Sequence, residues 1–195
     1  MEATRRSSRF IVALAGALAV CGLLAATASA GPVPQTSPPD PLDPRTTAPE
    51  SRLFLVTHAI GFQTYQCNAT GSAWTFTGPL ATLYKTTGTS KPIGTHFRNP
   101  VTTRPVWQLK DGSSVEATAI VTVPAGIGNI PSLLLQAAAT AAGPDGDRLT
   151  STTFIQRLNT TGGIAPAGAC TPGASVAVPY TADYFFWRAG GENDG

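Results

Sequence analysis

Short segments rich in β-branched and aromatic residues recur along the chain, with turn-forming residues between them about every ten positions. Segments of this length and composition are typical of strands, and their even spacing is typical of an all-β domain. Strands are expected near residues 53–58, 61–67, 73–77, 81–85, 93–98, 105–110, 114–123, 149–159 and 176–188. The pattern therefore predicts a mainly β fold, an antiparallel sandwich or a flattened barrel.

The clearest turn is Lys110-Asp111-Gly112-Ser113, which lies between two apolar-rich segments. Because Asp-Gly tolerates positive φ at both central positions, the sequence predicts a type I′ hairpin here. The two flanking strands are then expected to pair antiparallel.

One segment favours a helix instead of a strand. Residues 131–142 begin with a proline, contain leucines and alanines, and are followed by Gly143-Pro144. Proline in the first turn and Gly-Pro after the last turn are start and stop signals for a helix. We therefore expect one short helix that covers a face or a mouth of the β-structure.

The stretch VTVPAGIGNIPSLLLQAAAT, residues 121–140, has the order of a dinucleotide-binding motif: strand, glycine loop and expected helix. Gly126 and Gly128 fit the fingerprint, but Pro131 stands at the third glycine position, where the helix must pack closely on the strand. A single helix among strands also lacks the repeated βαβ framework. The sequence therefore predicts no cofactor, and it argues against a nicotinamide-dependent dehydrogenase.

The first thirty residues have the pattern of a secretory signal peptide. Three arginines precede an apolar run at residues 10–24, and Ala28-Ser29-Ala30 forms a small-residue cleavage site. The run is shorter than the roughly twenty residues of a membrane span, and no later segment competes with it. We expect export with cleavage near Ala30 and no membrane span in the mature chain. Twin-arginine export through Arg5-Arg6 and lipidation at Cys21 are the alternatives.

The rest of the chain divides by composition. Residues 31–49 are proline-rich with few large apolar side chains, which predicts an extended linker. Residues 50–188 are expected to form a single β-rich domain, and residues 189–195 a disordered tail. Without the predicted signal peptide, ten basic and ten acidic residues remain. This balance predicts no basic face for nucleic acid.

Two cysteines remain in the predicted mature chain, Cys67 and Cys170. Thiols of exported proteins oxidise, so an even pair predicts one disulfide. A reactive thiol is the alternative, but the local sequence shows no neighbouring base to activate it.

Several short motifs follow one another between residues 55 and 187. They are residues 61–67 (GFQTYQC), Trp74, 81–83 (ATL), 94–96 (GTH), Trp107, 111–113 (DGS), 130–131 (IP), 133–135 (LLL), 155–157 (IQR), 161–163 (TGG), Pro166, Cys170 and 180–184 (YTADY). This ordered set resembles an uncharacterised secreted family, the domain of unknown function 3455. The resemblance implies no catalytic residues, because the family has no established activity.

Three polar residues are the best candidates for chemistry: His96, Asp111 and Asp183. His96 lies two residues after Gly94 in an expected strand, and with Asp111, Glu116 or Asp183 beside it, it could act as a general base. The alternative is a histidine hydrogen-bonded inside the fold. Asp183 lies in an aromatic strand and needs a partner if it faces inward, and Arg157 is a natural one, which predicts a structural ion pair. Short-spaced ligand pairs are lacking, so no metal site is predicted.

Aromatic side chains on a β-face can stack on sugars or on apolar ligands. The candidate ligand-facing aromatics are Trp74, Trp107 and Tyr184. The sequence thus predicts an exported binding or structural module, with a small molecule or a carbohydrate as the candidate ligand. The alternative is a cofactor-free secreted hydrolase that uses His96 with an acidic partner.

Overall fold

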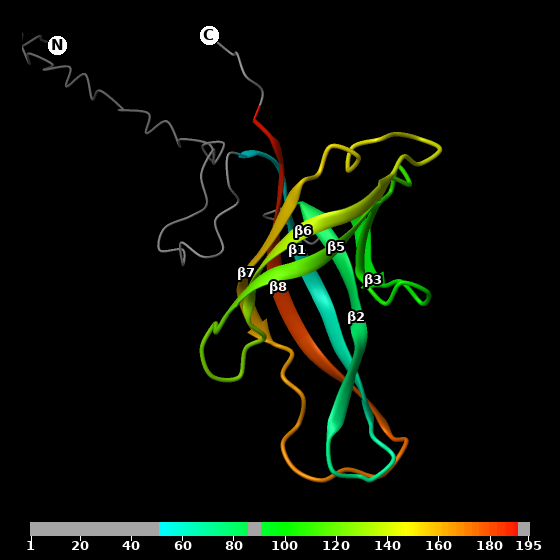
Figure 1. Ribbon diagram of the computed structural model, residues 1–195, viewed down its shortest axis with the longest axis vertical. Coiled ribbons are helices and arrows are strands. Elements are labelled where there is room, and N and C mark those ends of the chain that lie inside the picture. Colours follow the sequence, from blue (N-terminus) through cyan, green and yellow to red (C-terminus); the bar gives the residue numbers. More distant parts are fainter. Residues whose placement is uncertain (1–50, 86–90, 191–195) are drawn as a thin grey trace, which may run out of the picture. The chain divides into compact units, whose positions relative to one another are not determined.

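Eight antiparallel strands form one closed barrel in a computed structural model that describes residues 51–85 and 91–190 (Figure 1). Each strand pairs with the next along the chain, and β8 pairs back with β1. The strands are β1 (Ser51–Cys67), β2 (Trp74–Lys85), β3 (Pro92–Arg98), β4 (Pro105–Leu109), β5 (Ser114–Val123), β6 (Ser132–Ala141), β7 (Phe154–Gly162) and β8 (Ser175–Ala189). The predicted class, mainly β with an antiparallel sheet, is confirmed.

The predicted signal peptide (residues 1–30) and linker (residues 31–49) lie outside the described residues, as does most of the predicted tail. Among the described residues, none forms a helix with the length and hydropathy of a membrane span.

Two strands are longer than predicted because their glycines do not interrupt pairing. Residues 53–58 and 61–67 belong to the single strand β1, and residues 74–77 and 81–85 to β2, which begins one residue after the predicted start at Ala73. Gly61 lies opposite Ala81 in the ladder. A Cβ atom at Gly61 would stand 2.3 Å from the Leu80 carbonyl oxygen, so only glycine permits this approach of β1 and β2.

The predicted helix at residues 131–142 is wrong, because this segment is strand β6. It pairs with β5 on one side and β7 on the other. Leu133 and Leu135 contact the apolar cluster inside the barrel, whereas Leu134 belongs to a second cluster. Because both faces of β6 are apolar, the segment lacks the alternation of a half-exposed strand, and its leucines and alanines resemble a buried helix.

The hairpin at residues 110–113 forms as predicted, but its turn is different. Gly112 N–H donates to the Leu109 carbonyl and Leu109 N–H to the Ser113 carbonyl, so Lys110 and Asp111 are the central residues of the turn. Only Gly112 has positive φ, at 82°. This arrangement is a three-residue loop with a glycine bulge and not type I′.

The half of the barrel interior next to this hairpin is filled with apolar side chains, and we call it the packed end. Its members are 6 % exposed or less: Leu55, Leu83, Leu109, Val115, Leu149, Ile155 and Phe186. Leu149 comes from the connection between β6 and β7, which lies against the hairpin. Asp145 N–H donates to the Asp111 carbonyl, and Leu149 N–H to the Ser113 hydroxyl.

Candidate functional site

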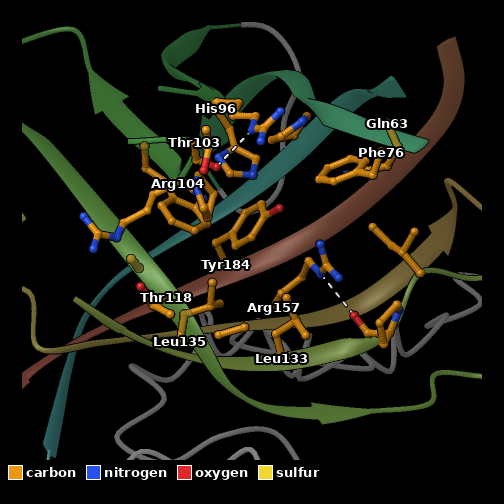
Figure 2. Close-up of a pocket in the computed structure, with 18 of the residues that line it drawn as sticks. Gln63, Phe76, His96, Thr103, Arg104, Thr118, Leu133, Leu135, Arg157 and Tyr184 are labelled. Atoms are coloured by element: carbon orange, nitrogen blue, oxygen red, sulfur yellow. Dashed lines mark hydrogen bonds between the residues drawn. The ribbon is translucent and has the colours of Figure 1, made fainter. Parts of the chain in front are cut away.

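A cavity of about 440 Å³ lies beside the packed end, inside the barrel (Figure 2). We call it the pocket. Its inner wall is buried and is formed by Gln63, His96, Trp107, Ala117, Ile130, Leu135 and Tyr184. Its outer rim includes exposed residues: Phe76, Thr103, Arg104, Thr118 and Ala119. The pocket therefore leads from solvent to an aromatic floor.

The opening follows from a gap in strand pairing. In the described residues, β4 pairs with β5 only at positions 114–116 of β5, so residues 117–119 have no partner on that side. The connection between β3 and β4 flanks this gap. Glu116 holds the connection by accepting hydrogen bonds from Asn99 and from the Thr102 hydroxyl, the latter at 2.7 Å.

His96 is packed into the aromatic floor. Its ring stacks on Trp107 at a centroid distance of 4.3 Å, and the Tyr184 ring meets it edge-on at 5.0 Å. Nδ1 donates to the Val106 carbonyl oxygen at 2.8 Å, which leaves Nε2 as an acceptor. Burial lowers the pKa of His96 to about 3. The imidazole is therefore neutral at physiological pH.

The structure does not bring either predicted carboxylate to His96. Asp183 accepts a hydrogen bond from His58 Nδ1 at 2.7 Å and from Asn159 at 2.8 Å. Asp111 lies in the β4–β5 hairpin, and hydrogen bonds from Ser113 lower its pKa. Neither carboxylate lines the pocket. The acid–base pairing that a hydrolase would need at His96 is thus not assembled.

The predicted ion pair between Arg157 and Asp183 is wrong. Arg157 lies opposite Tyr184 in the ladder between β7 and β8, whereas Leu158 lies opposite Asp183. Consecutive residues of a strand point to opposite faces, so Arg157 faces the barrel interior and Asp183 the exterior. The partner of Asp183 is His58, which lies directly opposite it on β1.

Arg157 is the pocket residue that sequence reasoning placed wrongly. Its Nε donates to the Pro131 carbonyl oxygen at 3.0 Å, and Figure 2 shows its side chain beside Tyr184. Burial raises the pKa of the pocket tyrosines Tyr65 and Tyr184 and lowers that of His96, and the positive charge of Arg157 opposes the first effect and adds to the second. The sequence contains a signal for this placement, because Arg157 lies two residues after the apolar Ile155 in the same strand and so shares its inward face.

Buried polar atoms without a hydrogen-bond partner include the hydroxyls of Tyr180 and Tyr184, which are close enough to Arg157 to feel its charge. Five side chains in the described residues have such an atom: Thr57, Gln63, Trp107, Tyr180 and Tyr184. Gln63, Trp107 and Tyr184 belong to the pocket lining. The Tyr184 hydroxyl is close enough to Arg157 and Tyr180 for these groups to shift its pKa, yet none meets it with hydrogen-bond geometry. Native proteins rarely leave such groups unpaired, so the cluster calls for a functional explanation.

The predicted ligand-facing aromatics divide into two places. Trp107 and Tyr184 line the pocket with their centroids 5.1 Å apart. Trp74 begins β2 opposite Cys67 and is not part of the lining.

The predicted disulfide between Cys67 and Cys170 is confirmed, with the Cα atoms 5.9 Å apart. It joins the tip of the β1–β2 hairpin to the connection before β8, and both lie at the lower end of the barrel in Figure 1. This connection also supports the pocket, because the Gly163 carbonyl oxygen accepts a hydrogen bond from the hydroxyl of Tyr65, a lining residue.

Fold and pocket together define an eight-stranded antiparallel barrel with an internal cavity. A family model described as a protein of unknown function (DUF3455) matches residues 47–188, and the chain belongs to this family. No curated protein and no solved structure matches the chain. A function therefore has to be argued from the pocket itself.

Proposed function

We propose that this protein is an exported binding protein that holds a small, mostly apolar molecule in the pocket. The observation that carries the proposal is the cavity of about 440 Å³, which runs from the exposed rim to the buried floor formed by Trp107 and Tyr184. Cavities of a few hundred cubic ångströms with mainly apolar walls and a few polar groups are typical of small-molecule sites.

The structure of the pocket keeps the entropic cost of ligand binding low. Its walls come from strands of a closed sheet, and the His96–Trp107 stack and the hydrogen bond to Val106 hold the floor. A preformed wall loses little conformational freedom when a ligand enters. Apolar ligand surface moved from water onto Leu133 and Leu135 contributes about 25 cal/mol per Å² before the costs of association.

Export is the second part of the proposal. The disulfide between Cys67 and Cys170 supports it, because such bonds persist in oxidising compartments. The signal peptide predicted at residues 1–30 is in agreement. Intact-mass measurement of protein recovered from the medium or the cell envelope tests this part: a mature chain beginning at Gly31 supports it, and an uncleaved cytoplasmic chain contradicts it.

Nile red, a neutral apolar dye, tests the binding function. We expect saturable fluorescence enhancement with the native protein. Ala119→Phe places a ring at the pocket rim and should abolish it. Ala139→Phe adds the same ring at an exposed position of β6 outside the lining and should leave dye binding unchanged. Equal binding by all three proteins, or no binding by the native protein, would contradict the proposal and favour a structural module.

A further inference from the structure

We infer that the molecule held in the pocket is an amphipathic monocarboxylic acid whose carboxylate pairs with Arg157. This inference rests on the proposed function, because it names the chemical class of the ligand for the same pocket. Four features of the pocket lead to it: its charge, the geometry of Arg157, the unpaired donors beside it, and the apolar walls.

The charge of the pocket is positive. Its lining contains Arg98, Arg104 and Arg157 and no acidic residue. In the described part of the chain, Arg157 has no carboxylate within ion-pair distance. Glu116, near the opening, already accepts hydrogen bonds from the side chains of Asn99 and Thr102. A half-buried guanidinium among apolar side chains is poorly solvated. An anion that enters the pocket therefore gives Arg157 the charged partner that the protein itself does not supply.

The three arginines differ in their availability. Arg98 donates hydrogen bonds to the carbonyl oxygens of Thr77 and Thr103. These bonds occupy its guanidinium and stabilise the rim of the pocket. Arg104 is exposed at the opening, where water competes for its charge. Arg157 donates only its Nε, to Pro131, and this contact orients the planar group. The terminal N–H groups remain free for a bidentate contact, the geometry that a carboxylate matches.

A hydroxyl donor lies beside this guanidinium. Tyr184 is fully buried, its hydroxyl has no hydrogen-bond partner, and Figure 2 shows it next to Arg157. Burial raises the pKa of Tyr184, so the phenol keeps its proton at neutral pH. A carboxylate oxygen on Arg157 would lie close to this donor and would supply the acceptor that the hydroxyl lacks.

The remaining walls suit an apolar body and not a sugar. Ile130, Leu133 and Leu135 come from one side, and Phe76 closes the rim. A carbohydrate would leave many hydroxyl groups unpaired against these walls, which is costly. If each non-hydrogen atom takes about the 30 Å³ of a liquid water molecule, the cavity holds roughly fifteen. A carboxylic acid with about ten carbons is within this size.

The experiment compares decanoate with decanol, which has the same chain length and no charge, by displacement of Nile red. With the native protein, decanoate should bind about tenfold more tightly than decanol. Arg157→Gln should remove this preference while decanol binding is retained. Arg157→Lys should keep part of it, because lysine restores the charge but not the bidentate fork. Arg188→Gln, at an exposed position of β8 outside the lining, is the matched control and should keep the preference.

The outcomes separate the two proposals. Nile red binding with equal affinities for decanoate and decanol would overturn the carboxylate inference and leave the binding function standing. A native preference for decanoate that survives in Arg157→Gln would overturn the role of Arg157. Absence of binding by Nile red and by both ligands would overturn the proposed function. The native ratio needs no variant, so the inference stays testable even if the substitutions at Arg157 prevent folding.

Discussion

The two ends of the barrel interior are built from the same sheet and differ in what fills them. At the packed end, the inward positions carry Leu83, Leu109, Val115 and Phe186, and all four side chains are buried. At the pocket, inward positions of β5, β7 and β8 carry Ala117, Arg157 and Tyr184, beside the aliphatic Leu133 and Leu135 of β6. The pocket therefore depends on a small side chain at an inward position together with the gap in pairing between β4 and β5.

The connections add to this contrast. Leu149 belongs to the connection between β6 and β7, residues 142–153, and is fully buried in the packed end. On the other side, the β3–β4 connection flanks the gap between β4 and β5, and a hydrogen bond from Thr102 to Glu116 holds it there. One end is thus stabilised by burial, and the other keeps polar groups whose pairing is incomplete. Such a division is expected where a rigid scaffold supports a binding site.

The largest expected effect comes from removing the covalent support of the pocket. Replacing Cys67 and Cys170 together by serine opens a loop that spans 103 positions of sequence. In the chain-entropy model this loss lowers the free energy of unfolding by about 4 to 5 kcal/mol. Urea denaturation of the variant and the native protein measures it. A loss below about 1 kcal/mol would mean that the disulfide does not support this region.

A matched pair of substitutions tests the difference in packing directly. Leu83 is fully buried at the packed end, whereas Leu133 lines the pocket and is half-buried. Leu83→Ala should lower the free energy of unfolding by about 3 kcal/mol, since it creates a cavity, and Leu133→Ala by about 1 kcal/mol. Denaturant titration gives both values. Equal losses would contradict the distinction between the two ends.

The pocket should also be the acid-sensitive part near neutral pH. The folded pKa of His96, about 3, lies below the unfolded value of 6.5. The stabilisation from the neutral imidazole is therefore full above pH 6.5 and is lost as the pH falls toward 3. Between pH 7 and pH 5 the native protein should lose about 2 kcal/mol relative to His96→Asn, which does not titrate. Parallel pH profiles of unfolding for the two proteins would refute this.

The smallest expected effect concerns the hairpin at the packed end. Hydrogen bonds from the Ser113 side chain and from the Ser113 and Arg148 backbones lower the pKa of Asp111. Their stabilisation is present above the unfolded pKa and is lost as the pH falls through the folded one. Asp111→Asn should cost roughly 1 kcal/mol at pH 7 and less at pH 3. The acid window of this hairpin is thus lower than that of His96. A cost that does not change between the two pH values would argue against the ionised carboxylate.

Much of the fold could be predicted from local sequence. Strand β5 has the bounds that its β-branched residues and turn signals indicate, and β8 differs from its prediction by one residue at each end. The hairpin at Asp111 is also predicted from local sequence, although the predicted turn type, I′, is wrong. These features depend on neighbours in the chain, where composition and turn chemistry act directly.

The errors fall where distant segments decide the outcome. Residues 132–141 favour a helix by composition, but the ladders with β5 and β7 and apolar contacts on both faces make them a strand. Asp183 needed a partner, and the register with β1 selects His58 instead of Arg157. Tertiary packing overrides propensity in both cases, because the ladder and the buried contacts outweigh weak local preferences.

The sequence by itself determined the antiparallel β class, the pairing of Cys67 with Cys170 and the family, because strand patterning and an isolated cysteine pair leave few alternatives. Only the tertiary structure decided that the sheet closes and that a pocket remains inside it. It also decided that Arg157, Trp107 and Tyr184 meet there. These residues come from β7, β4 and β8, and their meeting depends on strand register around a closed ring, which local sequence does not encode.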